Sequence, residues 1–161
     1  MCEERKIVLV DIDGTISKVG ERLKHLKKEP PDWDSFYEDC FEDEPILPIV
    51  GLVRAIMHEH CGDHSTYEVV FCTGRRESVR EKTTIWLQRY FDFGYELSCC
   101  DKLLMRKDGD FRHDTEVKPE LLIESGIKIE YVAFVIEDRN SMVKKWREMG
   151  FVCIQPVEGD F

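Results

Sequence analysis

The stretch Ile7-Val8-Leu9-Val10-Asp11-Ile12-Asp13-Gly14-Thr15 carries the strongest signal in the chain. Residues 7–10 are apolar and mostly β-branched, as in a central parallel strand that is buried on both faces. Asp11 and Asp13 follow where that strand ends, at the edge where open α/β sheets bind their ligands. Their like charges would repel unless a cation lies between them or one carries a proton. We therefore interpret this segment as a catalytic loop rather than as a strand that simply ends in an Asx turn.

Composition limits the class of protein. The chain has 161 residues, enough for one domain with a substantial core, and 42% of them are hydrophobic. The formal net charge of -10 disfavours nonspecific attraction to nucleic acid or anionic membrane, so a polyanionic substrate would need a local basic patch. The seven cysteines lack the even number and spacing of a disulfide scaffold, which indicates free thiols and a cytoplasmic location. We expect no targeting segment and no membrane association.

Hydrophobic periodicity and turn residues predict alternating strands and helices. Strands are expected at 7–10, 67–72, 102–105, 131–136 and 151–154, and helices at 49–61, 77–90, 120–125 (with Pro119 at its start) and 141–149. This order is typical of an α/β fold with a mainly parallel sheet flanked by helices. Residues 17–48 interrupt the alternation, and Asp32 is a plausible N-cap for a short aromatic helix within them. We interpret residues 17–48 as a small insertion, or cap, over the mouth of the sheet, and expect Trp86 and Trp146 in the core.

Three further segments place polar residues at the ends of later strands. Thr73-Gly74-Arg75 offers a hydroxyl, a flexible backbone and a guanidinium that can cradle a phosphate, although many Thr-Gly turns have no such role. Lys118 lies at a predicted helix start, and alone it would count as a surface lysine. Glu137-Asp138 follows the strand at 131–136, and carboxylates are the ligands that Mg²⁺ prefers. Because these segments occur in order on successive strand ends, they support one another.

This order of motifs resembles the haloacid dehalogenase (HAD) superfamily of phosphohydrolases over essentially the whole chain, which implies a Rossmann-like fold. The resemblance implies that Asp11 is the nucleophile that forms an aspartyl-phosphate and that Asp13 is the general acid–base. Thr73, with Gly74 beside it, and Lys118 would hold the phosphoryl oxygens. The physics agrees with these roles, because a carboxylate approaches a phosphate dianion only where cations offset the repulsion.

The same resemblance implies Mg²⁺, bound by the Asp11 carboxylate, the Asp13 backbone carbonyl and Asp138. Many members have two aspartates in this last motif, whereas this chain has Glu137 first. Asp138 is therefore the expected metal ligand, and Glu137 is expected to contact the metal ligands rather than the metal. A carboxyl beside Asp11 and phosphate should have a raised pKa, although bound Mg²⁺ acts the other way. We therefore expect a raised pKa for Asp13 and a pH optimum on the acid side of neutrality.

A narrower resemblance is to the 3′-phosphatase domain of the phage polynucleotide kinase-phosphatases. It rests on residues 18–22, 73–78 and 114–118 and on the ending Gly159-Asp160-Phe161. It implies that Arg22 and Arg75 contact the substrate phosphate and that Asp114 is a further essential acid. Two features depart from that family. The 161 residues contain no Gly-rich Lys-Ser/Thr kinase motif, and the insertion between Arg22 and Pro48 is longer than expected, which leaves the substrate size open.

The function expected first is removal of the 3′-phosphate from DNA or RNA ends in nucleic-acid repair, with a separate kinase or ligase as a partner. Two alternatives stay open: a phosphatase for a small nucleotide or phosphometabolite, and a non-catalytic module that binds phosphorylated ends or a protein. The set Asp11, Asp13, Thr73, Lys118 and Asp138 argues against the second alternative, because a binding module needs no nucleophile and proton shuttle together. We expect one phosphatase domain over residues 1–161, in the host cytoplasm if the chain is viral.

Overall fold

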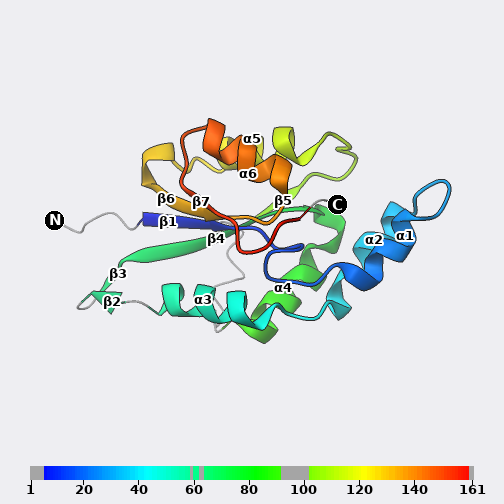
Figure 1. Cartoon of the computed structure of the whole chain (residues 1–161), viewed down its shortest axis with the longest axis horizontal. Helices are drawn as coiled ribbons and strands as arrows, with labels where there is room; N and C mark the ends of the chain where they lie inside the picture. The colour runs from blue at the N-terminus through cyan, green and yellow to red at the C-terminus, as the bar shows by residue number, and fades with distance from the viewer. Residues whose placement is uncertain (1–5, 59, 62–63, 92–101, 160–161) are drawn as a thin grey trace.

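The centre of the molecule is a five-stranded sheet in the order β5-β4-β1-β6-β7, in which all neighbouring strands are parallel (Figure 1). The computed structural model describes residues 6–58, 60–61, 64–91 and 102–159. The strands of this sheet are β1 (Lys6–Val10), β4 (Tyr67–Arg76), β5 (Leu103–Arg106), β6 (Val132–Ile136) and β7 (Cys153–Ile154). Helices α5 (Asp114–Glu124) and α6 (Asn140–Glu148) cover one face, and α3 (Leu47–Met57) and α4 (Arg80–Tyr90) cover the other. The predicted α/β class is confirmed.

Strand β1 is buried on both faces, as its continuous apolar sequence predicts. Val8 and Val10 pack in the same cluster as Trp86 of α4, whereas Leu9 packs in the cluster of Trp146 of α6. Both tryptophans are in the core, as expected. Because β1 pairs with β4 on one side and β6 on the other, its carboxyl end is the point where crossovers diverge and where open sheets bind ligands.

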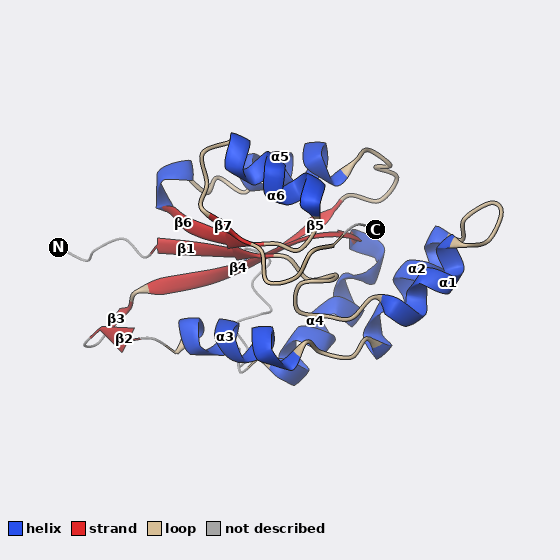
Figure 2. Cartoon of the chain, in the orientation of Figure 1, coloured by secondary structure: helices blue, strands red, loops and turns tan. Residues whose placement is uncertain are grey.

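The insertion between β1 and α3 is a group of short helices. They are η1 (Gly20–Arg22), α1 (Leu23–Leu26), α2 (Trp33–Glu38) and η2 (Asp39–Glu42). Figure 2 shows α1 and α2 beyond the carboxyl ends of the strands, as expected of a cap. Asp32 caps α2 by accepting a hydrogen bond from the Ser35 amide, as predicted. Within α2, Phe36 is buried, whereas Trp33 is 43% exposed.

The predicted start of one helix near the site is wrong. Helix α5 begins at Asp114, well before Pro119, because the His113 side chain caps it by accepting a hydrogen bond from the Thr115 amide. Pro119 therefore lies inside the helix instead of starting it. Lys118 lies in the second turn of α5, not at a helix N-terminus as predicted.

Other predicted boundaries also shift. Helix α3 runs over Leu47–Met57 instead of 49–61, because Pro48 fits the first turn of a helix, where no amide donor is needed. Residues 60–61 form β2, which pairs with β3 (His64–Ser65). The 3-10 helix η3 (Glu77–Val79) precedes α4, and η6 (Ile129–Tyr131) precedes β6. Strand β4 extends through Thr73–Arg76, so the phosphate-cradle motif lies on a strand end with irregular pairing rather than in a turn.

Two compositional predictions can be compared with the described residues. Cys40, Cys72 and Cys153 are free and buried, in agreement with the expected reduced thiols. Within the same part of the chain, none of the helices has both the length and the apolar character needed to cross a membrane.

Candidate active site

The loop after β1 places Asp11 close to Asp138 at the carboxyl edge of the sheet. The Asp11 amide still donates to the Ile136 carbonyl of β6, which fixes the start of the loop against the sheet. The Thr15 hydroxyl lies 2.9 Å from Asp11 Oδ2 and 3.0 Å from Asp138 Oδ1, and it accepts a hydrogen bond from the Asp138 amide. A hydroxyl has one proton, so Thr15 can donate to only one of these two carboxylates at a time.

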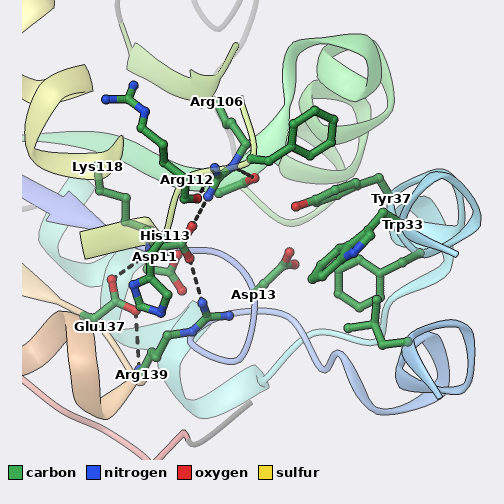
Figure 3. A pocket seen from close by; sticks show the side chains of 15 residues that line it. Asp11, Asp13, Trp33, Tyr37, Arg106, Arg112, His113, Lys118, Glu137 and Arg139 are labelled. Carbon is green, nitrogen blue, oxygen red and sulfur yellow. Dashed lines mark hydrogen bonds and ion pairs between the residues drawn. The ribbon is translucent and has the colours of Figure 1, made fainter. Parts of the chain in front are cut away.

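Lys118 is the cation that serves Asp11. Its Nζ atom donates to Asp11 Oδ1 at 2.6 Å and to Glu137 Oε2 at 2.7 Å, and all three side chains are buried (Figure 3). Burial alone would lower the pKa of Lys118, but the charges of Asp11 and Glu137 raise it well above its ordinary value. Lys118 is therefore a permanent ammonium at the floor of the site. The same burial raises the pKa of Asp11, against the effect of Lys118.

Asp13 has a different set of cations. Its Oδ1 atom accepts hydrogen bonds from Arg22 Nη2 at 2.7 Å and from Arg75 Nε at 2.9 Å. Burial opposes ionisation of Asp13, but the charges of Arg75 and Arg22 outweigh it and lower the pKa. Without phosphate the pKa of Asp13 is thus lowered, an effect that the sequence could not show because it depends on two guanidiniums that converge on this carboxylate. The predicted rise beside a bound phosphate stays a prediction. Lys118 is therefore the cation beside Asp11, whereas Arg22 and Arg75 are the cations beside Asp13.

Asp43, in the insertion, completes the Asp13 cluster. It accepts hydrogen bonds from Arg22 Nε and Nη2, both at 2.7 Å, and from Arg75 Nη2 at 2.9 Å. Burial raises the pKa of Asp43, although both arginines act the other way. Arg22 and Arg75 are 2% and 0% exposed, and their guanidiniums bind carboxylates rather than lining the cavity. Their predicted contact with the substrate phosphate stays a prediction.

A cavity of about 420 Å³ opens above these groups (Figure 3). Of the predicted site residues, those that line it are Asp11, Asp13, Gly74, Asp114, Lys118 and Glu137. Arg22 and Arg75 bind Asp13 of the lining, and Asp138 shares a carboxylate cluster with Asp11. The Thr73 hydroxyl accepts a hydrogen bond of 3.2 Å from the Arg75 amide. The structure therefore brings all of the predicted site residues into one place.

Asp114 is partly buried and lies between two arginines that the sequence did not single out. Arg106 Nη2 donates to Asp114 Oδ1, and Arg139 Nη1 donates to Oδ2 at 2.9 Å. Burial would raise the pKa of Asp114, but Lys118 and these arginines lower it. Gly74 is needed beside this acid, because a Cβ atom at position 74 would lie 2.7 Å from Asp114 Oδ1.

The acids around Lys118 fit a divalent cation. Asp11, Glu137 and Asp138 each offer an oxygen, and these atoms lie within 4.8 Å of one another. Burial and the charge of Asp11 raise the pKa of Glu137 to about 8 and that of Asp138 to about 7, so the protein alone leaves this negative charge poorly compensated. A hard cation with oxygen ligands is the complement of such a cluster. Lys118 binds one oxygen of Asp11 and one of Glu137, whereas Asp138 Oδ1 lies beside the neutral Thr15 hydroxyl, so Asp138 is the freest of the three ligands.

The segment after β7 supports Asp138. The Gly159 amide donates to the Asp138 carbonyl at 2.9 Å, and Gln155 Nε2 donates to the same oxygen at 2.8 Å. A Cβ atom at position 159 would lie 2.0 Å from Asp138 Oδ2, so only glycine leaves room for this carboxylate. Sequence reasoning used Gly159 only as part of a family ending and missed this role.

Other contributors were missed for lack of a local signal. Asp43 lies in an acidic run of the insertion, where its neighbours look equally suitable. Arg106 lies at the end of β5, a position on a parallel strand edge that could have drawn attention to it. Arg139 follows Glu137-Asp138 directly, and the same positional rule could have included it.

Solved phosphatase structures share this fold. The class C acid phosphatase from Bacillus anthracis, with tungstate bound, matches with a TM-score of 0.57 at 14% identity, covering 99% of this chain and 70% of that one. CbbY from Rhodobacter sphaeroides, in complex with phosphate, matches with a TM-score of 0.56 at 13% identity, covering 98% and 88%. At such identities the likeness shows the fold alone.

A family model assigns the chain more narrowly. The model for the polynucleotide kinase PNKP phosphatase domain matches residues 5–161, and the chain belongs to that family. A chain of the Pnkp1/Rnl/Hen1 complex is 30% identical with a TM-score of 0.74, covering all of this chain and 49% of that one. The "Putative bifunctional polynucleotide kinase/RNA ligase" of Autographa californica nuclear polyhedrosis virus is 28% identical over 160 residues, 97% of this chain and 20% of the relative. This chain thus spans about half the length of the first relative and about a fifth of the length of the second.

Proposed function

We propose that this phosphatase domain is a Mg²⁺-dependent polynucleotide 3′-phosphatase that forms an aspartyl-phosphate on Asp11. The observation that carries the proposal is the buried pair of Asp11 and Lys118, 2.6 Å apart, in the same carboxylate cluster as Asp138. A carboxylate held beside an ammonium at the floor of a cavity is suited to attack phosphorus, because the cation offsets the charge of the phosphate. Membership of the PNKP phosphatase family supports nucleic-acid ends as the substrate.

The chemistry divides into two displacements. Asp11 attacks phosphorus, and the leaving oxygen of the nucleotide takes a proton from Asp13 as the aspartyl-phosphate forms. Water then attacks the same phosphorus and gives its proton to Asp13, which releases inorganic phosphate and restores Asp11. Asp13 is ionised beside Arg22 and Arg75, and the approach of a phosphate dianion would raise its pKa toward the protonated form that the first step needs.

Mg²⁺ would bind to the Asp11 and Asp138 carboxylates and the Asp13 backbone carbonyl, and when bound it supplies positive charge at the phosphoryl oxygens. Thr73, Gly74 and Lys118 would hold those oxygens. Arg22 and Arg75 would act on the phosphate or through Asp13. Arg106 and Arg139 would position Asp114.

We further propose that residues 1–161 act as one phosphatase domain whose cap is the insertion at about 17–48. A separate kinase or ligase would complete end repair, because one relative comes from the Pnkp1/Rnl/Hen1 complex and the other is named for kinase and ligase activities. Free buried thiols suit the cytoplasm, which would be that of a host if the chain is viral.

One experiment separates the candidate functions. The same oligonucleotide, as DNA and as RNA, is offered with a 3′-phosphate, a 5′-phosphate or neither, beside a small chromogenic phosphate ester, with Mg²⁺ or with a chelator. We expect Mg²⁺-dependent release of phosphate from the 3′-end only, and its loss in Asp11→Asn. Rapid cleavage of the small ester with 3′-ends ignored would favour a metabolite phosphatase. Binding of phosphorylated ends without turnover would favour a non-catalytic module.

A further inference from the structure

The wall of the cavity opposite Lys118 and the carboxylates is aromatic. Trp33 and Tyr37 of α2 lie across the cavity from Lys118 (Figure 3). Phe111 of the loop after β5 also lines the cavity, and we call these three rings the aromatic wall. The reaction described above uses none of the three. The cavity of about 420 Å³ is much larger than a phosphoryl group, so a substrate that fills it has a second part next to this wall.

The rings of the aromatic wall form a row with a cation inside it. Trp33 and Tyr37 are one helical turn apart and stack with their centroids 6.1 Å apart and their planes at 28°. The Arg76 guanidinium lies 4.9 Å from the centroid of the Tyr37 ring and 5.3 Å from that of Phe111, and it joins the insertion to the loop after β5. Arg76 also pairs with Asp34, which holds it in place.

Two of these rings leave much of their surface to solvent. Trp33 is 43% exposed and Phe111 is 78% exposed, although both line a cavity. Exposed apolar surface at a cavity rimmed by charged residues is typical of a binding site. Arg112 and Arg139 also line the cavity, where Arg112 pairs with Asp110 and Glu120 and Arg139 pairs with Asp114.

We propose that the aromatic wall is a stacking platform for the nucleobase next to the scissile phosphate, with the exposed face of Trp33 as its main contact. Flat π-faces beside cations are the means by which proteins bind single-stranded nucleic acid, because every base offers a face to stack. A phosphate ester without a base would leave these rings uncovered. The platform rests on the proposed function and deepens it: the substrate is a 3′-phosphate that carries an unpaired base.

The test compares two oligonucleotides that differ only in the terminal 3′-phosphorylated nucleotide, which carries a base in one and is abasic in the other. For the wild-type protein we expect kcat/KM to fall about tenfold on the abasic end, through KM. Trp33→Ala should lose about tenfold on the base-carrying end and almost nothing on the abasic end, whereas Trp33→Phe keeps the preference. Leu52→Ala removes a side chain of equal exposure, 43%, on α3 and should behave as wild type.

Two outcomes would overturn the platform: equal losses on both ends in Trp33→Ala, or a wild-type protein that cleaves both ends equally well. A failure of the proposed function has another signature, because then no oligonucleotide is cleaved by any variant. In that case the platform is tested by fluorescence with adenosine 3′-monophosphate and ribose phosphate. We expect adenosine 3′-monophosphate alone to quench the wild-type tryptophan emission, and Trp33→Phe to lose the quenching. Equal quenching in both proteins contradicts the platform.

Discussion

Asp11 and Asp13 are separated by one residue, yet their environments differ in kind. Asp11 faces an ammonium, Lys118, and burial raises its pKa. Asp13 faces the two guanidiniums of Arg22 and Arg75, which lower its pKa. Different environments for neighbouring carboxyls are the means by which active sites assign different tasks to the same residue type.

Arg75→Lys tests the environment of Asp13. Arg75 reaches Asp13 through Nε and Nη2, and its Nη2 also contacts Asp43 and Ser17, a set that a single ammonium cannot reproduce. We expect activity on a 3′-phosphorylated oligonucleotide to fall more than about tenfold, or about 1.4 kcal/mol. Lysine keeps the charge but makes fewer hydrogen bonds to the Asp13 carboxylate, so the pKa of Asp13 rises. Because the first displacement needs protonated Asp13, the alkaline limb of the pH–rate profile should move to higher pH.

The control for Arg75→Lys is Arg89→Lys, an exposed arginine of α4 that lies over Phe41. It should keep the wild-type rate and pH profile. A wild-type profile in Arg75→Lys as well would show that this guanidinium does not set the charge of Asp13.

At the scale of elements, the site depends on two segments outside the sheet. The insertion contributes Asp43, whose carboxylate joins Arg22 of η1 to Arg75 of β4. The segment after β7 contributes Gly159 and Gln155, which hold the Asp138 backbone. The loop after β1 and helix α5 thus supply the reacting groups Asp11, Asp13 and Lys118, and these two further segments support them.

Asp43→Asn tests the link between the insertion and the sheet. Removing one charge from a buried cluster leaves two guanidiniums with a single carboxylate partner, a change that typically costs about 3 kcal/mol or more. We expect the free energy of unfolding, measured by urea denaturation, to fall by that order. The neighbouring Glu44→Gln breaks an exposed pair with Lys18 and should leave stability unchanged. Equal stability of the two variants would contradict the role of Asp43.

Gly159→Ala tests the segment after β7. The new methyl group would collide with Asp138 Oδ2, so the carboxylate must move away from the cluster. We expect the Mg²⁺ concentration for half-maximal activity to rise by about 10- to 100-fold. In Gly51→Ala, by contrast, nothing lies within 4 Å of the added methyl, and Mg²⁺ dependence should not change. An unaltered Mg²⁺ requirement in Gly159→Ala would rule out this positioning role.

At the scale of the whole molecule, the sequence predicted the residues whose positions are determined by the strands of the sheet. Residues that directly follow parallel strands converge at one edge, so Asp11, Thr73 and Asp138 could be placed together from strand ends alone. Lys118 was placed correctly by its motif, although its helix starts earlier than predicted. The role of Asp43 and the lowered pKa of Asp13 could not be predicted, because both depend on which side chains the insertion presents to the sheet. Such tertiary contacts leave no periodic signal in the chain.

The balance of charge in the cluster predicts how pH and Mg²⁺ act on stability. Burial raises the pKa of Glu137 from its ordinary 4.5 to about 8, so between these values the folded state binds more protons than the unfolded state. This contribution to stability is complete below about pH 4.5 and is lost as the pH rises through about 8. The same sign holds for Asp138, whose pKa rises to about 7.

We therefore expect Tm of the metal-free protein to fall between pH 6 and pH 8, and Mg²⁺ to raise Tm more at pH 8 than at pH 6, because a cation replaces the missing protons. Thermal unfolding with a chelator or with Mg²⁺ measures both effects without any substrate. Glu137→Gln cannot titrate at this position, so its Tm should depend less on pH than that of the wild-type protein. A Mg²⁺ effect that is equal at the two pH values, with the same pH dependence in Glu137→Gln, would show that these carboxylates do not compete for protons and metal.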